Sequence, residues 1–273
     1  MSDVRAMLVG KVNDVWTRRI ETISSDALGE GEVLIAVEYS CINYKDGLST
    51  TEKGKVARID PLIPGVDLAG TVIESSDPSV AVGSQVIAHG NDIGVAHHGG
   101  FATMARVPAK WIVPMPAGLT TKTAMMVGTA GFTAAMSVDA LERAGLKTGT
   151  GPVLVTGATG GVGSYAVGML AARGYEVVAS TGKASEAEWL KSIGATEIID
   201  RSETSVEQTK PLEKERWAGA VDCDGSAVVA ALPGTAAVPR AAVGNGGRLS
   251  VSAGAPPGGP IVTERASTCC RTH

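Results

Sequence analysis

The chain has 273 residues, a formal net charge of −4 and a hydrophobic content of 44%. This length allows one large domain or two modest ones, and the apolar content is sufficient for a buried core. The sequence has no block of Lys and Arg, which argues against a nucleic-acid partner, and its longest nearly apolar run (125–136) is shorter than the ~18 residues of a membrane span. The four cysteines do not form a disulfide framework and the first twenty residues lack the apolar core of a signal peptide, so we expect a cytoplasmic protein.

Residues 1–124 are predicted to form a compact, barrel-like β domain. Short stretches with β-branched or alternating apolar residues recur there and are separated by Gly, Pro, Asn and Asp. We expect strands at residues 6–10, 32–42, 67–75, 84–90 and 100–107. Short strands at this spacing are typical of a small barrel.

The pattern changes near residue 122. Residues 121–146 are rich in Ala, Met and Leu at helical spacing, and strands then alternate with helices. Such alternation requires crossover connections and predicts an α/β fold with a doubly wound parallel sheet. The expected elements are strands at 153–157, 176–180, 196–200 and 218–224, and helices at 162–173 and 185–193, the second with a capping box at Ser185 and Glu188 and a stop at Gly194.

The last fifty residues differ in composition from the rest. From Asp224 onward Gly, Ala and Pro dominate, and GAPPGGP at 254–260 can be neither a helix nor a central strand. Residues 246–254 are compatible with one further strand. We expect residues 256–273 to form an irregular tail.

The stretch TGATGGVG at 156–163 lies between an apolar strand and an amphipathic helix, which is the context that a dinucleotide-binding turn requires. Glycines in this turn allow a tight exit from the strand, a close approach of the backbone to a pyrophosphate and close packing of helix on strand. The start of the helix presents N–H groups to the phosphate. The alternative is a tight turn without a ligand. The predicted cofactor-binding residues of this turn are Gly157, Thr159, Gly160, Gly161, Val162 and Gly163.

The second strand of this unit ends without the Asp or Glu that binds the ribose 2′-hydroxyl of NAD. A carboxylate would repel a 2′-phosphate, whereas hydroxyl groups and cations attract it. Arg201, which follows the third strand, supplies a second cation. We therefore predict NADPH as the cofactor, with contacts from Ser180, Thr181, Gly182, Lys183 and Arg201. The alternative for Lys183 is a solvated surface lysine.

Five motifs in combination resemble the zinc-independent medium-chain dehydrogenase/reductase superfamily. They are NYKDGL (43–48), PLIPGVDLAGTV (61–72), GVAHHGGFATMARV (94–107), GTAGFTAAM (128–136) and TGATGGVGS (156–164). The resemblance runs from about residue 6 to residue 223 and is closest to NADPH-dependent acrylyl-CoA reductases, a group that also carries the name quinone oxidoreductase. It implies a GroES-like catalytic domain at 1–124 and an NADP-binding Rossmann domain at 125–255, with 256–273 outside both.

The resemblance also bears on metal binding. Zinc-containing members of the superfamily carry Cys where Asn43 stands and a His-Glu pair where Val66 and Asp67 stand, and neither set of ligands is present in this sequence. We therefore predict no metal. His97 and His98 are consecutive and are expected in a loop near the mouth of the active site. Without a Lewis acid, the favoured reaction is hydride addition to a C=C bond conjugated with a thioester or quinone carbonyl.

The resemblance implies that Tyr44, Asn43 and Asp46 are the catalytic residues. Tyr44 is also predicted to contact the cofactor, and the alternative for Asp46 is a residue that only forms the turn. Thr129 is expected near the nicotinamide, with a hydroxyl bonded inside the protein as the alternative. Cys41 is interpreted as a small buried residue and not as a nucleophile.

The function implied is NADPH-dependent reduction of acrylyl-CoA to propanoyl-CoA, with small-molecule substrates and no nucleic-acid or membrane partner. A quinone oxidoreductase and a non-catalytic dinucleotide-binding protein are the alternatives. Four cations of the 44–58 loop, available to coenzyme A phosphates but equally compatible with an ordinary solvated loop, are Lys45, Lys53, Lys55 and Arg58.

The C-terminus departs from the family after about residue 223, where the pattern becomes VDCDGS (221–226). Family members continue beyond residue 273 with segments that complete the Rossmann sheet and the catalytic domain and help build a homodimer. The stretch TERASTCCRTH (263–273) is compatible with sequence read out of frame. We therefore expect an incomplete Rossmann domain, since loss of these segments exposes a sheet edge and leaves backbone groups unpaired.

Overall fold

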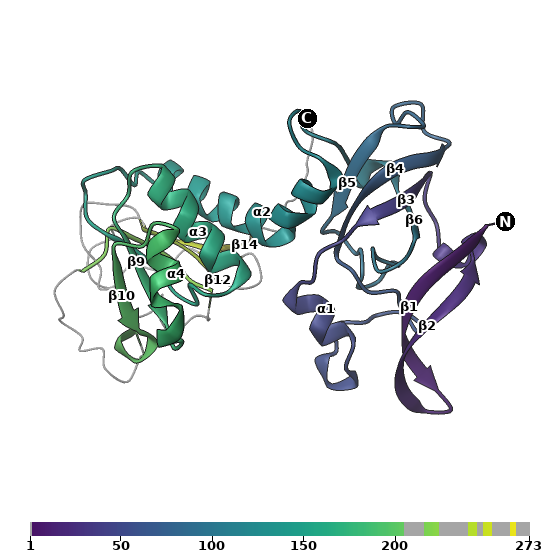
Figure 1. The fold of residues 1–273 in the computed structure, drawn as a ribbon, viewed down its shortest axis with the longest axis horizontal. Coiled ribbons are helices and arrows are strands. Elements are labelled where there is room, and N and C mark those ends of the chain that lie inside the picture. Colours follow the sequence, from purple (N-terminus) through teal and green to yellow (C-terminus); the bar gives the residue numbers. More distant parts are fainter. Residues whose placement is uncertain (1, 205–215, 224–239, 245–247, 253–262, 266–273) are drawn as a thin grey trace. The chain divides into compact units, whose positions relative to one another are not determined.

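A computed structural model describes residues 2–204 and 216–223, and the backbone of 240–244, 248–252 and 263–265. The chain forms two compact units, Met1–Thr129 and Ala130–His273 (Figure 1). The boundary lies inside a long helix, between Thr129 and Ala130.

Unit 1 contains a five-stranded antiparallel sheet with the strand order β6-β3-β4-β5-β7. Val33 and Ile35 of β3 and Leu68 of β4 are buried in one core cluster, whereas Leu34, which points to the opposite face of β3, is buried in another, so both faces of β3 are covered. The strands are β3 (Val33–Tyr39), β4 (Asp67–Ser75), β5 (Gln85–His89), β6 (Met104–Val107) and β7 (Ile112–Pro114).

A two-stranded hairpin precedes this sheet and consists of β1 (Asp3–Val12) and β2 (Val15–Ser24). Val4, Ala6 and Leu8 of β1 are buried against Leu34 and Ile63, so the hairpin covers a second core cluster. Unit 1 also contains one short α-helix and three 3-10 helices, namely α1 (Tyr44–Ser49), η1 (Ser25–Leu28), η2 (Glu52–Gly54) and η3 (Ala109–Trp111).

The long helix α2 (Thr121–Arg143) is interrupted at Gly128, whose backbone is non-helical (φ 52, ψ −162). Within the described part of the chain, α2 is the one helix that is long and apolar enough to cross a membrane by length and composition. The interruption divides it into residues 121–127 and 129–143, and neither part has the ~18 residues of a span. The second part packs in the core of unit 2.

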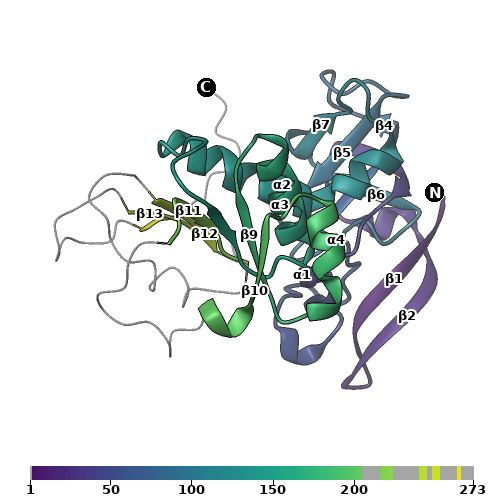
Figure 2. The same ribbon diagram turned by 60° about the vertical axis from the view of Figure 1, so that its left-hand side comes forward.

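Unit 2 contains a four-stranded parallel sheet with the order β10-β9-β8-β11. In chain order this is 3-2-1-4, the arrangement of a Rossmann half, so the prediction of a β-rich domain followed by a doubly wound parallel sheet is confirmed. Figure 2 shows the neighbouring strands of this sheet. Its elements are β8 (Val153–Val155), α3 (Gly161–Ala172), β9 (Val177–Thr181), η4 (Ala184–Glu186), α4 (Ala187–Ser192), β10 (Glu197–Asp200), η5 (Arg201–Thr204) and β11 (Gly219–Val221).

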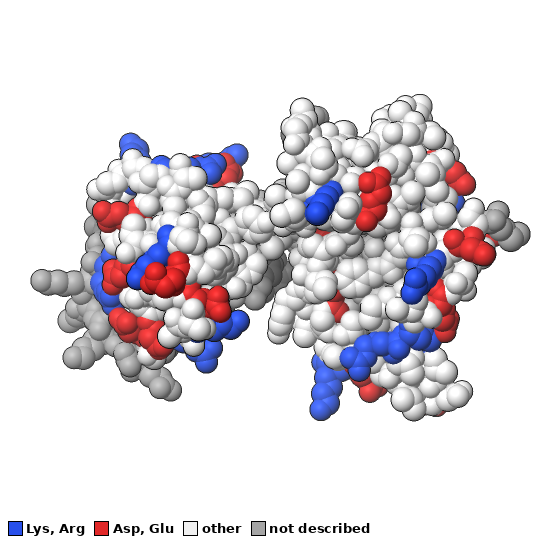
Figure 3. Space-filling model, viewed as in Figure 1, with Lys and Arg blue, Asp and Glu red and all other residues white. Residues whose placement is uncertain are grey.

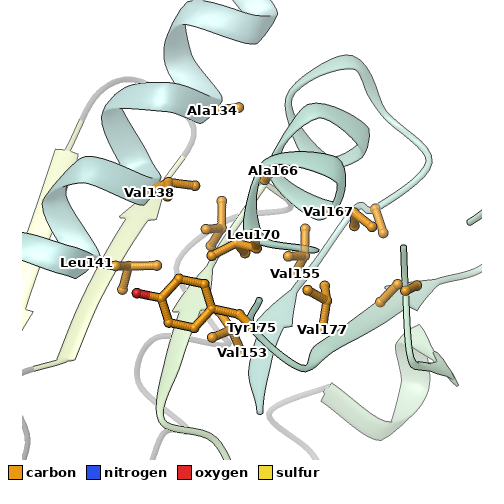
Figure 4. Packing of buried hydrophobic residues seen from close by; sticks show 14 of the residues in the cluster. Ala134, Val138, Leu141, Val153, Val155, Ala166, Val167, Leu170, Tyr175 and Val177 are labelled. Atoms are coloured by element: carbon orange, nitrogen blue, oxygen red, sulfur yellow. The ribbon is translucent and has the colours of Figure 1, made fainter. Parts of the chain in front are cut away.

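The core of unit 2 is formed where α2 and α3 pack on β8 and β9 (Figure 4). Val138 and Leu141 of α2 face Leu170 of α3, and all three side chains are at most 1% exposed. Tyr175 lies at the edge of this core, and its hydroxyl donates to Glu142 Oε1 (3.3 Å) and to the Leu146 carbonyl oxygen (3.4 Å). The start of β9 is thereby attached to α2.

Two local predictions for unit 2 are wrong. The capping box at Ser185 and Glu188 does not form, because Ser185 lies inside η4 and its hydroxyl contacts Glu186 Oε1 (3.5 Å). A three-residue strand, β14 (Thr263–Arg265), lies in the stretch expected to be an irregular tail, where it pairs with β13 (Arg248–Ser252). β13 itself confirms the strand predicted within 246–254. It also pairs with β12 (Arg240–Gly244), and these three strands form a separate antiparallel sheet. The GAPPGGP stretch lies outside the described residues.

Candidate active site and dinucleotide-binding turn

Asp46 fixes the start of α1. Its carboxylate accepts three backbone hydrogen bonds, from Asn43 N–H (2.7 Å) on Oδ2 and from Gly65 and Val66 N–H (3.0 Å each) on Oδ1. The side chain is 1% exposed, and this burial raises the pKa of Asp46 above its ordinary value against the opposing effect of the backbone donors. The Asp46 carboxylate therefore holds the start of α1 against residues 65 and 66. This contact fits the alternative given in the sequence analysis, in which Asp46 only forms the turn.

Tyr44 is the first residue of α1 and is 77% exposed. Its hydroxyl makes no hydrogen bond to any residue that the structure describes. Ile42, two residues earlier, is 88% exposed. The Asn43 end of α1 thus presents one phenol and one aliphatic side chain to solvent, and a phenol can donate a hydrogen bond to a ligand.

A buried carboxylate, Asp67 at the start of β4, joins two segments of unit 1. Its Oδ1 accepts Cys41 N–H (3.0 Å), and its Oδ2 accepts the Asn43 side-chain amide (2.9 Å). The same Oδ2 also accepts Thr129 N–H (3.0 Å), Thr129 Oγ1–H (2.8 Å) and the Cys41 thiol (2.9 Å). Asp67 is 0% exposed. We refer to Asp67, Cys41, Asn43 and Thr129 as the Asp67 cluster.

The Asp67 cluster directs the hydrogen-bond donors of its members inward. The Asn43 amide and the Thr129 hydroxyl both donate to the carboxylate. The Thr129 hydroxyl is therefore bonded inside the protein, which is the alternative that the sequence analysis gave for Thr129. Burial, assisted by the hydrogen bond to Asp67 and by its charge, raises the pKa of the Cys41 thiol to about 12. A thiol of that acidity stays protonated at neutral pH, in agreement with its interpretation as a non-nucleophilic residue.

Gly128 brings Thr129 to the cluster. Its positive φ of 52° is accessible to glycine without strain, and a Cβ at this position would lie 2.5 Å from Cys41 Sγ. The interruption of α2 at Gly128 therefore turns Thr129 toward Asp67.

His97 and His98 hold a loop in place. His97 Nε2 lies 2.8 Å from the Glu30 carbonyl oxygen, and its ring packs edge-on against Trp111 with centroids 5.2 Å apart. His98 Nδ1 accepts Ile63 N–H (3.1 Å). No group of three or more His, Cys, Asp or Glu side chains that could hold a metal ion occurs in residues 2–204 and 216–223.

In unit 2, β8 runs into a tight turn at the carboxyl edge of the sheet. Gly157 has a positive φ of 55°, and a Cβ on Gly163 would overlap the Gly157 carbonyl oxygen and lie 2.8 Å from Ala158 Cα. Gly160 is the N-cap of α3, so the N–H groups of the first turn of this helix have no partner within it. These features fit a pyrophosphate at the helix start, because both the backbone donors and the close approach are provided.

The end of β9 lies beside this turn. Thr181 Oγ1 accepts Lys183 N–H (3.1 Å) and is 3.3 Å from Thr159 Oγ1. A Cβ on Gly182 would lie 3.0 Å from Arg201 Cδ, so the Arg201 side chain passes over Gly182. Lys183 and Arg201 are both exposed. The predicted cations therefore flank the end of β9 without a carboxylate on that strand.

Ser180 differs from the other residues predicted to bind the cofactor. It is 0% exposed, and its hydroxyl is 3.3 Å from Thr204 Oγ1. Its carbonyl oxygen accepts Ala158 N–H (3.1 Å), which ties β9 to the glycine turn. Ser180 thus lies beneath the turn and supports it.

Comparison with known protein families identifies the chain. Residues 29–117 match the alcohol dehydrogenase GroES-like domain, and residues 161–266 match the zinc-binding dehydrogenase family. The chain belongs to the medium-chain dehydrogenase/reductase superfamily. The relatives that it matches at about half identity are oxidoreductases. The second match continues beyond residue 223, to residue 266.

Several relatives within this superfamily are similar over most of the chain. The acrylyl-CoA reductase AcuI of Ruegeria pomeroyi is 51% identical over 215 residues, which are 79% of this chain and 65% of that protein. The structure of E. coli K-12 YHDH with bound NADPH is 44% identical with a TM-score of 0.83, and covers 88% of this chain and 74% of that chain. The Bacillus subtilis protein yhfP with NAD bound is 48% identical with a TM-score of 0.82, at 85% and 70% coverage. The chain thus spans only part of each relative.

The sequence did not reveal the role of Asp67 in this oxidoreductase fold. Asp67 stood out only as the position where zinc-containing members have a Glu. A local signal was present, since an acid in the otherwise apolar run PGVDLAG at 64–70 must be paired if it is buried. Its partners could not be read from the sequence, because they lie 26 and 62 residues away.

Proposed function

We propose that the chain is an NADPH-dependent reductase that converts acrylyl-CoA to propanoyl-CoA. The observation that carries this proposal is the 51% identity with an acrylyl-CoA reductase over 79% of the chain. The substrate is a small molecule, and neither a nucleic acid nor a membrane is a partner. We place the enzyme in the cytoplasm, and a homodimer like that of the family is compatible with the proposal.

The choice of NADPH rests on the end of β9. Solved relatives hold NADP, NADPH or NAD, so the superfamily accepts both dinucleotides. In this chain Lys183 and Arg201 flank Gly182 with no acid on the strand. A 2′-phosphate is attracted by these two cations and gains hydrogen bonds from a guanidinium, whereas the uncharged 2′-hydroxyl of NADH gains no such charge attraction.

The chemistry follows from the substrate. Bound NADPH supplies a hydride to the β-carbon of the acrylyl group. The two electrons of the C=C bond then form an enolate on the thioester, and a proton added at the α-carbon completes the reduction. Tyr44 is our candidate for the donor to the thioester oxygen, because its hydroxyl is exposed and faces no competing acceptor among the described residues. Asn43 and Asp46 position Tyr44 through the start of α1.

The test is binding and turnover with the full chain. Fluorescence of bound NADPH should appear on titration and disappear when acrylyl-CoA is added, with propanoyl-CoA as the product. Tyr44→Phe, which removes only the hydroxyl, should lower kcat by about 10- to 100-fold and leave the Kd for NADPH unchanged. Binding of NADPH without turnover of any acceptor would refute the enzymatic proposal and favour a dinucleotide-binding protein.

A quinone oxidoreductase is the second candidate. The Bacillus subtilis relative YhfP, 49% identical over 228 residues, is named a quinone oxidoreductase. The same titration discriminates the two, because turnover with a quinone and none with acrylyl-CoA would select this reading.

A further inference from the structure

The segment that carries α1 and η2 has an excess of positive charge. Lys45, Lys53 and Lys55 are exposed, and none of the ion pairs between described residues includes them. The acids of the segment do not compensate them, since Glu52 pairs with Lys11 (3.2 Å) and Asp46 is buried. Figure 3 shows several Lys and Arg side chains, with Asp and Glu beside them, in the part of unit 1 where Figure 1 draws α1 and the β1–β2 hairpin.

The backbone of this segment is fixed at several points, so the lysines project from a rigid support. Asp46 ties the start of α1 to Gly65 and Val66, and Trp16 Nε1 donates to the Thr50 carbonyl oxygen (3.0 Å). Gly54 packs so closely on Leu48 that a Cβ would overlap the Leu48 carbonyl oxygen. η2 therefore folds back onto the end of α1.

Lys55 has a left-handed backbone (φ 51, ψ 27) directly after η2. Glycine or asparagine usually occupies such a position, because a longer side chain is strained there. Such backbone strain is concentrated at active sites and ligand sites. Here that side chain is an exposed cation two residues after the exposed Lys53.

Apolar surface adjoins the lysines on the N-terminal side. Ile42 and Tyr44 are 88% and 77% exposed, and they lie three residues and one residue before Lys45. A ligand that matches the whole segment therefore needs a neutral arm for Ile42 and Tyr44 and phosphates for the cations. A quinone has no anionic group to pair with the lysines.

We propose that residues 42–55 bind coenzyme A, with the neutral pantetheine arm along Ile42 and Tyr44 and the phosphates of the 3′-phospho-ADP end at Lys53 and Lys55. The proposal rests on the proposed function in one respect, since the thioester must lie at Tyr44. It adds the surface that distinguishes a coenzyme A thioester from other activated alkenes.

The test compares two substrates that share the reacting group. Acrylyl-pantetheine carries the acrylyl thioester and the neutral arm but not the 3′-phospho-ADP end of acrylyl-CoA. In the double variant Lys53→Glu/Lys55→Glu, the KM for acrylyl-CoA should rise by about 5- to 20-fold with kcat unchanged, and the rise should shrink at high salt. The KM for acrylyl-pantetheine and the Kd for NADPH should stay as in the native chain. Lys110→Glu/Lys147→Glu, which also reverses two exposed lysines but outside this segment, is the charge-matched control and should change none of these values.

Two results would overturn the proposal. One is an unchanged KM for acrylyl-CoA in the double variant, and the other is an equal rise in KM for both thioesters. If the chain reduces neither thioester, the proposed function fails, and calorimetric titration with free coenzyme A then tests the surface alone. Equal or undetectable affinity in the native chain and the double variant would overturn the site, whereas weaker binding to the variant would support it.

Discussion

Removal of the Asp67 carboxylate is the most informative perturbation of unit 1. Asp67→Ala leaves five hydrogen-bond donors without their acceptor, namely the N–H groups of Cys41 and Thr129, the Asn43 amide, the Thr129 hydroxyl and the Cys41 thiol. Each donor that loses a charged acceptor in a partly buried place costs about 1–2 kcal/mol, and water entering the space left by the side chain recovers part of it. The expected loss in the free energy of unfolding is therefore about 4–6 kcal/mol.

Smaller substitutions in the same cluster should give a graded series. Thr129→Val removes one donor without changing the shape of the side chain and should cost about 1 kcal/mol. Asp67→Asn keeps one acceptor oxygen but turns an amide N–H toward the remaining donors, so about 2–4 kcal/mol is expected. Thr71→Val is the matched control, because Thr71 also lies in β4 and donates to a carboxylate, Glu38 Oε1 (2.8 Å), but at an exposed site where the bond contributes about 0.5 kcal/mol or less.

Scanning calorimetry measures this series, and hydrogen exchange of peptides from unit 1 assigns each change to that unit, since two units need not unfold together. For a unit of this size 1 kcal/mol corresponds to about 3–5 °C in Tm, so Asp67→Ala should lower the Tm of unit 1 by more than about 10 °C. The double variant Asp67→Ala/Thr129→Val should be less destabilised than the sum of the single changes by about 1 kcal/mol. Additive losses, or a loss below about 1 kcal/mol for Asp67→Ala, would refute the role of the carboxylate.

Two further outcomes are expected. Gly163→Ala should raise the Kd for NADPH on the order of tenfold, because the new Cβ forces the Gly157 carbonyl away from the start of α3. The control is Gly168→Ala in the same helix, whose Cβ would meet only Ile193 O at 3.8 Å. Equal affinities of the two variants for NADPH in a fluorescence titration would contradict the turn geometry. Burial raises the pKa of Asp46 in the folded state above its ordinary value of 3.8, so protonation of Asp46 favours the folded state. The stability that protonated Asp46 contributes is fully present below pH 3.8 and is lost as the pH rises through the pKa of the folded state. The stability difference between the native chain and Asp46→Asn in urea unfolding should therefore fall as pH rises, and a difference that is constant with pH would contradict this reasoning.

The fold could be predicted from the sequence wherever an element carries a clear apolar run or an apolar periodicity of its own. β4 has the predicted bounds, and α3 and β9 are shifted by one residue, because each element has its own apolar periodicity. β2 was missed because its sequence VWTRRIETIS is charged at its centre and none of its residues is buried, and its pairing with β1 makes it a strand. α1 was missed as a helix because six residues that include a glycine have little helical preference of their own, and the Asp46 carboxylate stabilises their start.

The candidate site could be predicted only in its local parts. The glycine turn and the residues after β9 are contiguous, so their spacing indicates their chemistry before the structure is known. The orientation of Asn43 and Thr129 depends on Asp67, which approaches from another part of the chain, and no periodicity encodes this contact. The sequence therefore predicts which residues surround the reaction but does not show which of them position the others.

The features of unit 2 that fit a dinucleotide are contained in residues 153–223. In an open parallel sheet the ligand lies at the carboxyl ends of the strands where the strand order reverses, and here the reversal is between β8 and β11. β11 pairs in parallel with β8, and the Asp222 carboxylate that follows it accepts the Thr156 hydroxyl (2.6 Å) at the start of the glycine turn. Both sides of the reversal are therefore held together by described residues that precede the change in composition at Asp224. For this reason we expect NADPH affinity to depend on the turn and on the cations after β9 and β10, and to be separable from reductase activity, which also requires unit 1.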